Sequence, residues 1–95
     1  MCGITGYVSF GGISIRRDTL ESMSDVISHR GPDDNGCFLF DKSTREFSVF
    51  RKGDQALKVS EGQVGLGHRR LSILDLSESG WQPMLSVDQR IVLTF

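Results

Sequence analysis

Cys2 is the residue whose type and position offer the most chemistry in this sequence. It directly follows Met1, and its small side chain is the kind after which cells usually remove methionine. Removal would leave one residue that carries both a thiol and a free α-amino group. An α-amino group is roughly a tenth to a sixth unprotonated at pH 7, against about 0.04% for a lysine amine. The terminal amine could therefore take the thiol proton and pass it to a leaving amine.

A cysteine at this position also fits a small core residue without any chemical role. Lipidation is not indicated, because N-myristoylation needs glycine directly after methionine and no apolar signal precedes Cys2. The second candidate is the basic cluster His68-Arg69-Arg70, in which one guanidinium could hold a carboxylate through two parallel hydrogen bonds. Two solvated arginines are the alternative interpretation of this cluster.

The polar segment 28–36 holds the remaining candidates. Gly31-Pro32 is typical of a helix end, and Asp34-Asn35-Gly36 is a strong turn signal. Asp33 and Asp34 could be metal ligands, but adjacent carboxylates in a turn usually stay solvated. No pair of Cys or His residues has zinc-finger spacing, so we expect no metal site.

Composition excludes several classes of protein. The 95 residues fit one domain, and the net charge of -1 gives no electrostatic footprint for nucleic acid. No apolar run is long enough to span a membrane and no secretory signal is visible, so we expect a cytoplasmic protein. Cys2 and Cys37 are then expected as separate thiols, with Cys37 an inert core or sheet residue.

Apolar periodicity predicts the elements that position these groups. The patterns predict a helix from Asp18 to about Ser28, capped by Asp18, and a set of strands: Gly3–Phe10, Cys37–Phe40, Phe47–Arg51, Gln63–His68 and Arg90–Phe95. Segment 52–62 is predicted to be a loop and segment 81–84 a turn. One helix among several strands indicates an α+β domain.

Two of these strands bear on a site. The first would hold Cys2 rigidly at the head of a buried strand, with Ile4 and Val8 on one face. Gln63–His68 places only glutamine and glycine on one of its faces, at positions 63, 65 and 67. Small side chains there predict that a ligand or another chain segment lies against this face.

Four motifs, in order along nearly the whole chain, together resemble a known family. They are Met1-Cys2-Gly3-Ile4 with Gly6, the segment SHRGPDD at 28–34, the segment LGHRRLSILD at 66–75, and Gln82-Pro83-Met84. This set resembles the glutaminase domain of class II glutamine amidotransferases, and its Arg-Gly-Pro-Asp form is similar to the asparagine synthetase branch.

The resemblance implies an N-terminal nucleophile hydrolase fold, an αββα sandwich of two stacked sheets between helical layers. It implies that Cys2 attacks the side-chain amide of L-glutamine and that ammonia leaves from a thioester intermediate. Arg70 matches the arginine that holds the α-carboxylate of glutamine, Leu71, Ser72, Ile73 and Leu74 continue that wall, and Arg30 and Asp33 match supports of the pocket.

The resemblance covers about half of such a domain, residues 1–95. The family's Asn-Gly-Glu segment, which supplies an oxyanion donor, and a later aspartate that binds the glutamine amino group are absent. Losing an oxyanion donor typically costs about 10²–10³ in rate, so we expect little or no activity from this chain alone. We expect it to be part of a longer enzyme.

In that enzyme, ATP and Mg²⁺ would drive amidation of aspartate to asparagine by a synthetase domain of the same polypeptide, with homodimerisation a further expectation. The chain itself needs no cofactor, and no nucleic-acid or membrane partner is expected. The alternatives are an amidotransferase for another carboxylate acceptor, for example in polysaccharide synthesis, and a non-catalytic module that binds glutamine or a partner protein.

Overall fold

The computed structural model describes residues 2–55, 57–71 and 81–95. The elements in chain order are β1 (Gly3–Val8), β2 (Ile15–Arg16), α1 (Arg17–Val26), a 3₁₀ turn (Ser28–Arg30), β3 (Asp34–Asp41), β4 (Glu46–Phe50), β5 (Glu61–Gly62), β6 (Val64–Arg70), β7 (Met84–Leu85) and β8 (Val92–Leu93). This mixture of one helix with antiparallel strands is consistent with the α+β class.

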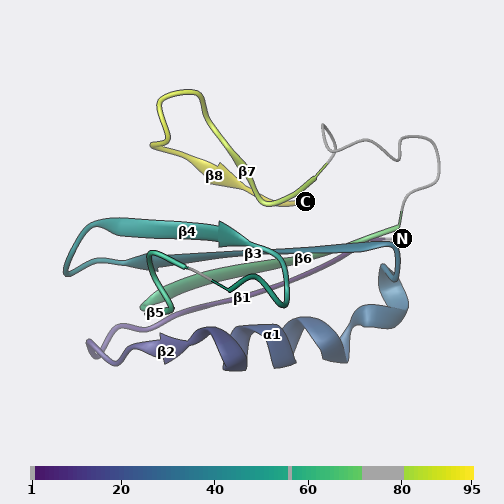
Figure 1. Cartoon of the computed structure of the whole chain (residues 1–95), viewed down its shortest axis with the longest axis horizontal. Helices are drawn as coiled ribbons and strands as arrows, with labels where there is room; N and C mark the ends of the chain where they lie inside the picture. The colour runs from purple at the N-terminus through teal and green to yellow at the C-terminus, as the bar shows by residue number, and fades with distance from the viewer. Residues whose placement is uncertain (1, 56, 72–80) are drawn as a thin grey trace.

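The central element is a four-stranded antiparallel sheet in the order β1-β6-β3-β4. Figure 1 shows α1 running along one face of this sheet, while the β7–β8 hairpin lies over the other face. The strands pair through Gly3 with Arg69 and through Gly36 with His68, so β6 is the strand that joins β1 to β3. The sheet thus has a helical side and a hairpin side.

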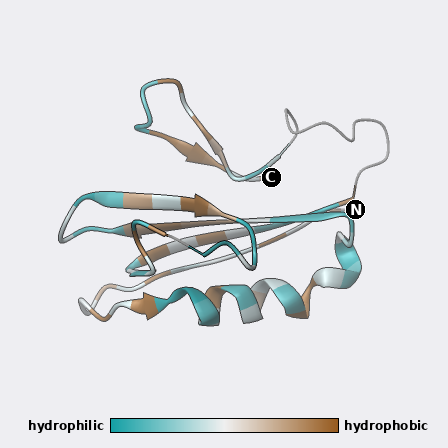
Figure 2. Ribbon diagram, viewed as in Figure 1, coloured by the Kyte–Doolittle hydropathy of each residue, from teal (hydrophilic) through white to brown (hydrophobic). Residues whose placement is uncertain are grey.

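The hydrophobic core lies between α1 and the sheet. Its buried members are Leu20, Cys37, Leu39, Phe50 and Val59. Alternate residues of β3 point to the hairpin side, where Phe38 is also buried. Figure 2 shows hydrophobic segments on β8 and on the sheet strands it faces, so apolar surface is present on both sides of the sheet.

The glycine face of β6 is occupied by another chain segment, as the sequence predicted. A Cβ on Gly65 would lie 2.3 Å from the Tyr7 ring, and one on Gly67 would lie 2.7 Å from the Thr5 methyl group. The glycines therefore let the side chains of β1 lie across β6. Of the two predicted occupants, a ligand or a chain segment, the structure shows the segment.

The predicted cap of the helix is wrong. Arg16 precedes α1, no side chain caps the helix, and Asp18 lies in its first turn. The Asp18 carboxylate accepts a hydrogen bond of 3.0 Å from Arg16 Nη2 instead. An acidic side chain in the first turn still favours the positive end of the helix dipole.

The predicted turn at Asp34-Asn35-Gly36 is also wrong, because these residues begin β3. A Cβ at Gly36 would lie 1.9 Å from the Gln82 main-chain oxygen and 2.7 Å from the Trp81 ring. Segment 81–82 approaches so closely that only glycine fits at position 36. A local turn pattern cannot reveal this long-range contact.

The first strand ends at Val8 and is not buried as expected. It lies at the edge of the sheet, and Ile4 and Val8 are 55% and 57% exposed. Their face is the hairpin side, whereas Tyr7 on the other face packs against the core. The final predicted strand shortens to β8, and segment 81–84 leads into β7. Within the described residues, no helix is long and apolar enough to cross a membrane.

Candidate functional site

Cys2 and Arg70 lie opposite each other at the ends of adjacent strands. The register pairs Gly3 with Arg69, so Cys2 and Arg70 are the next positions outward on the hairpin side of the sheet. Cys2 is partly buried and carries a free thiol. The main-chain N–H of Leu71 points to the Cys2 sulfur, with a nitrogen–sulfur distance of 3.5 Å. The sulfur therefore has a main-chain N–H donor beside it, and Arg70 lies on the same face of the sheet.

Arg70 is only 8% exposed and is held by the start of β3. Its main-chain oxygen accepts a hydrogen bond of 3.0 Å from the Asp33 N–H, and it pairs with Asp34 in the register. Burial tends to raise the pKa of Asp34, but hydrogen bonds from Arg51 and Asn35 and the nearby charges of Arg51 and Arg70 lower it overall. Asp34 is therefore a carboxylate at neutral pH, close to the predicted substrate-binding arginine.

The two predicted supports, Arg30 and Asp33, both donate hydrogen bonds to main-chain oxygens of site residues. Arg30 Nε donates a hydrogen bond of 3.4 Å to the Cys2 main-chain oxygen, and a Cβ on Gly3 would lie 3.3 Å from Arg30 Cβ. Asp33 is exposed and contributes its N–H to Arg70. Leu71 is described and partly buried, whereas Ser72, Ile73 and Leu74 lie outside the described residues.

Arg69 lies on the opposite face of β6 from Arg70. Its Nε donates to the Gly31 main-chain oxygen at 3.1 Å, and its Nη1 lies 3.7 Å from Asp25 Oδ1 on α1. These contacts place the Arg69 side chain on the helical side. The basic cluster is therefore divided between the two faces, and only Arg70 is on the face of Cys2.

Cys37 is structurally distinct from Cys2. It is 1% exposed in the core under α1, and burial, the largest cause, raises the pKa of its thiol to about 12. Its role as an inert sheet residue is consistent with this environment.

Sequence reasoning missed a polar network on the hairpin side. His68, treated only as part of the basic cluster, is 1% exposed, and its Nε2 lies 3.1 Å from the Phe95 main-chain oxygen. Gln82, 7% exposed, accepts a hydrogen bond of 2.7 Å from the Phe95 N–H. The signal in the sequence was the alternation along β6, which places His68 on the same face as Arg70.

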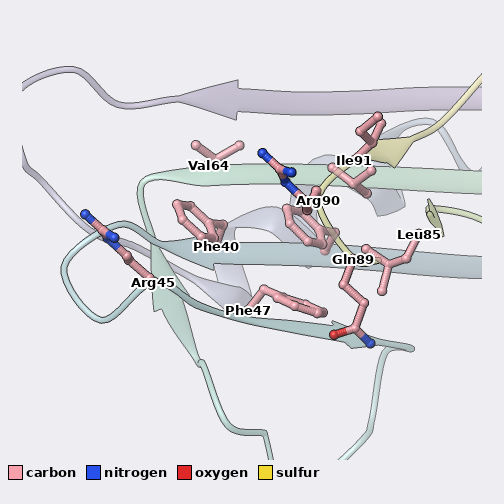
Figure 3. Close-up of a pocket in the computed structure, with 10 residues that line it drawn as sticks. Phe40, Arg45, Phe47, Val64, Leu85, Gln89, Arg90 and Ile91 are labelled. Carbon is pink, nitrogen blue, oxygen red and sulfur yellow. The ribbon is translucent and has the colours of Figure 1, made fainter. Parts of the chain in front are cut away.

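A cavity of about 320 Å³ lies elsewhere between the hairpin and the sheet. Its floor is apolar, from Phe38, Phe40, Phe47 and Val64, and its other walls come from segments 85 and 89–92 with Arg45. Figure 3 shows Phe40 and Phe47 on the sheet strands and Arg90 and Ile91 on the hairpin side of this cavity. Among the residues that the structure describes, no predicted site residue lines this cavity, and the lining includes no nucleophile or carboxylate.

Metal ligands do not gather in the part of the chain that the structure describes. No group of three or more His, Cys, Asp or Glu side chains is close enough there to hold an ion. Among the described residues, the contacts at Cys2 are those of its thiol with the Leu71 N–H and of its main-chain oxygen with the Arg30 guanidinium group.

Comparisons with known proteins place these observations in a wider context. The glutamine amidotransferase domain family matches residues 45–95, just over half of the chain. A Methanocaldococcus jannaschii protein, provisionally named asparagine synthetase [glutamine-hydrolyzing] 2, is 42% identical over 88% of the chain. Amidase chry2 of Gibberella zeae is 37% identical over 87%, and asparagine synthetase [glutamine-hydrolyzing] 3 of Bacillus subtilis is 34% identical over 88%.

The chain spans only 13%, 11% and 10% of the lengths of these three relatives. A search of the solved structures found no match.

Proposed function

The chain belongs to the glutamine amidotransferase domain family, and on that premise we propose that it carries the nucleophile and the carboxylate-binding arginine of a glutamine-hydrolysing site. Cys2 is the proposed nucleophile once Met1 has been removed, and Arg70 is the proposed ligand of the glutamine α-carboxylate. Leu71 to Leu74 would continue the substrate wall, with Arg30 and Asp33 supporting it.

The chemistry needs one proton carrier, for which the α-amino group of Cys2 is suited. The amine takes the thiol proton, and the sulfur attacks the side-chain carbonyl carbon of glutamine. The tetrahedral adduct expels ammonia, which receives that proton, and leaves a thioester on Cys2. Water then attacks the thioester, the amine again carries the proton, and glutamate departs as the thiol is restored. Atoms balance with glutamine and water entering and glutamate and ammonia leaving.

The observation that supports this proposal is the pairing of Gly3 with Arg69, which makes Cys2 and Arg70 the next opposed positions at this end of β1 and β6. Adjacent antiparallel strands hold opposed residues at about 5 Å between Cα atoms. A short amino acid can therefore place its carboxylate at Arg70 while its side-chain amide reaches the Cys2 sulfur. The Leu71 N–H also points to the sulfur, at a nitrogen–sulfur distance of 3.5 Å.

The layers of the molecule support the further proposal of an N-terminal nucleophile hydrolase fold. A helix, a sheet and a two-stranded hairpin lie in succession, and the hairpin face of the sheet carries both Cys2 and Arg70. In an αββα sandwich the hairpin would belong to the second sheet.

For the longer polypeptide, we propose that the ammonia amidates aspartate, since several relatives are named asparagine synthetases. ATP and Mg²⁺ would serve that step. The described residues do not fit these groups, because they contain no cluster of metal ligands, so no step here is assigned to them. The relative named as an amidase favours a second candidate, transfer of the ammonia to a different carboxylate acceptor.

The test is Cys2→Ala in the intact polypeptide that contains these residues. We expect glutamate release from glutamine and glutamine-dependent synthesis to be lost, while synthesis from free ammonia continues. Cys37→Ala is the matched control, because its thiol lies in the core on the opposite face of the sheet, and it should retain glutamine hydrolysis.

Glutaminase activity that survives Cys2→Ala would overturn the proposal. Intact-mass measurement of the N-terminus gives an independent check, because a retained Met1 would block the amine and favour a non-catalytic module instead.

A further inference from the structure

The main chain at Phe95 is held on both its polar groups by buried side chains from two different elements. His68 on β6 bonds the Phe95 main-chain oxygen at 3.1 Å, and Gln82 Oε1 accepts the Phe95 N–H at 2.7 Å. The Thr94 hydroxyl donates to the same Gln82 oxygen at 3.2 Å. We call His68 and Gln82 the Phe95 clamp.

The clamp is built from side chains that need these partners. His68 and Gln82 are 1% and 7% exposed, and a buried polar group left without a partner costs stability. Because a main-chain oxygen only accepts hydrogen bonds, His68 Nε2 must carry the proton. Burial lowers the pKa of His68, and Arg70 adds to this, while the Phe95 oxygen and Asp34 oppose it. The imidazole is therefore neutral at pH 7.

The clamp lies directly beside the candidate site. His68 pairs with Ile4 on β1 and Gly36 on β3, and it is two residues before Arg70 on the same face of β6. Two residues of a strand span about 7 Å, so the histidine that holds the Phe95 main chain and the proposed carboxylate ligand Arg70 are neighbours on one face of β6. Because Gly36 has no side chain, the Gln82 main chain can approach the sheet closely at this same point.

We propose that His68 is a positioning residue of the glutamine site: as a neutral hydrogen-bond donor it fixes the main chain at Phe95 as a wall beside Arg70 and Cys2. The inference rests on the proposed function, because it needs a substrate bound at Arg70. Gln82 holds the other side of the same main-chain unit. A wall fixed at two points restricts how the substrate amide can approach the sulfur.

The test compares His68→Leu with His68→Gln in the intact polypeptide. Leucine fills the space without a donor, whereas the glutamine amide can donate near the position of Nε2. A small displacement of bound substrate costs up to about a hundredfold in rate, so we expect His68→Leu to lower kcat/KM for glutamine hydrolysis by roughly ten- to a hundredfold. Because a single neutral hydrogen bond is retained, His68→Gln should remain within about threefold of the wild type.

Gln63→Leu is the matched control. Gln63 is also buried, at 2% exposed, but it bonds Lys42 and Ser14 at the far end of the sheet. It should keep wild-type kcat/KM even where it lowers thermal stability. Equal loss in Gln63→Leu and His68→Leu would overturn the proposal, since the effect would then be general destabilisation. A wild-type rate in His68→Leu, or no rescue by His68→Gln, would overturn it as well.

Gln82→Met supplies an independent variant, because methionine removes the acceptor at similar size. We expect a loss comparable to that of His68→Leu and a double variant no worse than either alone, since both hold Phe95. Additive losses would contradict a shared clamp. Failure of the proposed function can be told apart from failure of the inference about His68. If the proposed function is wrong, Cys2→Ala retains glutaminase activity, whatever the His68 variants do.

Discussion

At the scale of single residues, Arg69 and Arg70 show how strand geometry separates neighbours in sequence. Arg69 reaches the helical side, where it bonds Gly31 and approaches Asp25, whereas Arg70 is buried on the face of Cys2. Of these two arginines, the family resemblance assigned the α-carboxylate of glutamine to Arg70 and gave Arg69 no role. The alternation along β6 is consistent with that choice for a physical reason, because only one of two successive strand residues can share the face of the nucleophile.

Arg70→Lys should therefore weaken glutamine binding in the intact polypeptide. Lysine keeps the charge but replaces the planar fork by a point charge, which cannot form two parallel bonds to a carboxylate. Loss of one charge-assisted bond, about 1.5–3 kcal/mol, raises KM for glutamine by roughly ten- to 150-fold. Steady-state kinetics with glutamine and with free ammonia measure the effect. Arg69→Lys is the control and should leave KM within a few-fold; equal effects of both changes would count against the role of Arg70.

The two thiols should differ in reactivity towards iodoacetamide. Cys37 is buried and its pKa of about 12 leaves it almost wholly protonated near neutral pH, whereas Cys2 is partly exposed. Since the thiolate is the reactive form, native protein at pH 7.5 should be alkylated at Cys2 well before Cys37. Peptide mass mapping over time provides the measurement, with urea-unfolded protein as the control in which both react. Faster labelling of Cys37 in the native protein would contradict the structure.

At the scale of elements, β6 is the strand whose close packing against a neighbour is easiest to recognise in the sequence. Gly65 and Gly67 open its helical face to Tyr7 and Thr5, and the hydroxyl of Tyr7 then donates to the Gly62 main-chain oxygen at 3.1 Å. Burial, the cause of the shift, raises the pKa of Tyr7 to about 12, so this donor stays protonated. The glycines thus permit a contact that ties β1 to the chain before β6.

Gly65→Ala should loosen this contact. The new Cβ would lie 2.3 Å from a carbon of the Tyr7 ring, and overpacking of this kind typically costs about 1–3 kcal/mol. Hydrogen-exchange mass spectrometry of peptides from β1 and β6 should show faster exchange in the variant. Gly11→Ala is the control, because a Cβ at Gly11 would meet no atom within 4 Å beyond its chain neighbours, and exchange there should match the wild type. Unchanged protection in Gly65→Ala would show that the ring moves aside freely.

The elements also show what local sequence could and could not predict. Periodicity found α1, β3, β4 and β6, because their apolar residues pack either in the core under α1 or on the hairpin side of the sheet. It could not place the start of β3, since Gly36 reflects contact with a segment 46 positions later, at Gln82. It predicted a buried first strand because Ile4 and Val8 are apolar, but their burial depends on neighbours beyond the sheet edge, which no local pattern encodes.

For the site, the motif order identified Cys2, Arg70 and Leu71 as a set, and the structure brings Cys2 and Leu71 into contact. His68 and Gln82 stand in the family motifs, but no role was assigned to them, because the motifs do not show which polar side chains become buried and which partners they meet. His68 and Gln82 come together at Gly36, because β6 pairs with β3 there and segment 81–82 packs closely against the same glycine.

At the scale of the whole molecule, the hairpin layer and the sheet are joined at one end. The Trp81 indole donates to the Asn35 main-chain oxygen at 2.9 Å, and the Arg51 guanidinium lies 4.9 Å from the Trp81 ring centre. Arg51 is itself held by Asp34, whose oxygens accept from its Nε and Nη2 at 3.1 and 3.3 Å. The charge of Asp34 therefore orients the cation that covers Trp81, so it couples the sheet to segment 81–95.

This coupling predicts a pH-dependent attachment of segment 81–95. The pKa of Asp34 is lowered in the folded protein, so its contribution is complete above the ordinary carboxyl pKa and is lost as pH falls through the lowered value. Asp34→Asn should reduce hydrogen-exchange protection of segment 81–95 at pH 7 by roughly two- to fivefold, the range of a partly exposed ion pair. Protection is normalised to the intrinsic exchange rate at each pH.

Asp18→Asn, which alters an exposed ion pair with Arg16, is the control and should leave the hydrogen-exchange protection of segment 81–95 unchanged. Because protonation neutralises Asp34 in the wild type, the difference between wild type and Asp34→Asn should shrink as pH falls through the lowered pKa of Asp34. A difference that does not change with pH would mean that size or hydrogen bonding, and not charge, joins the two layers.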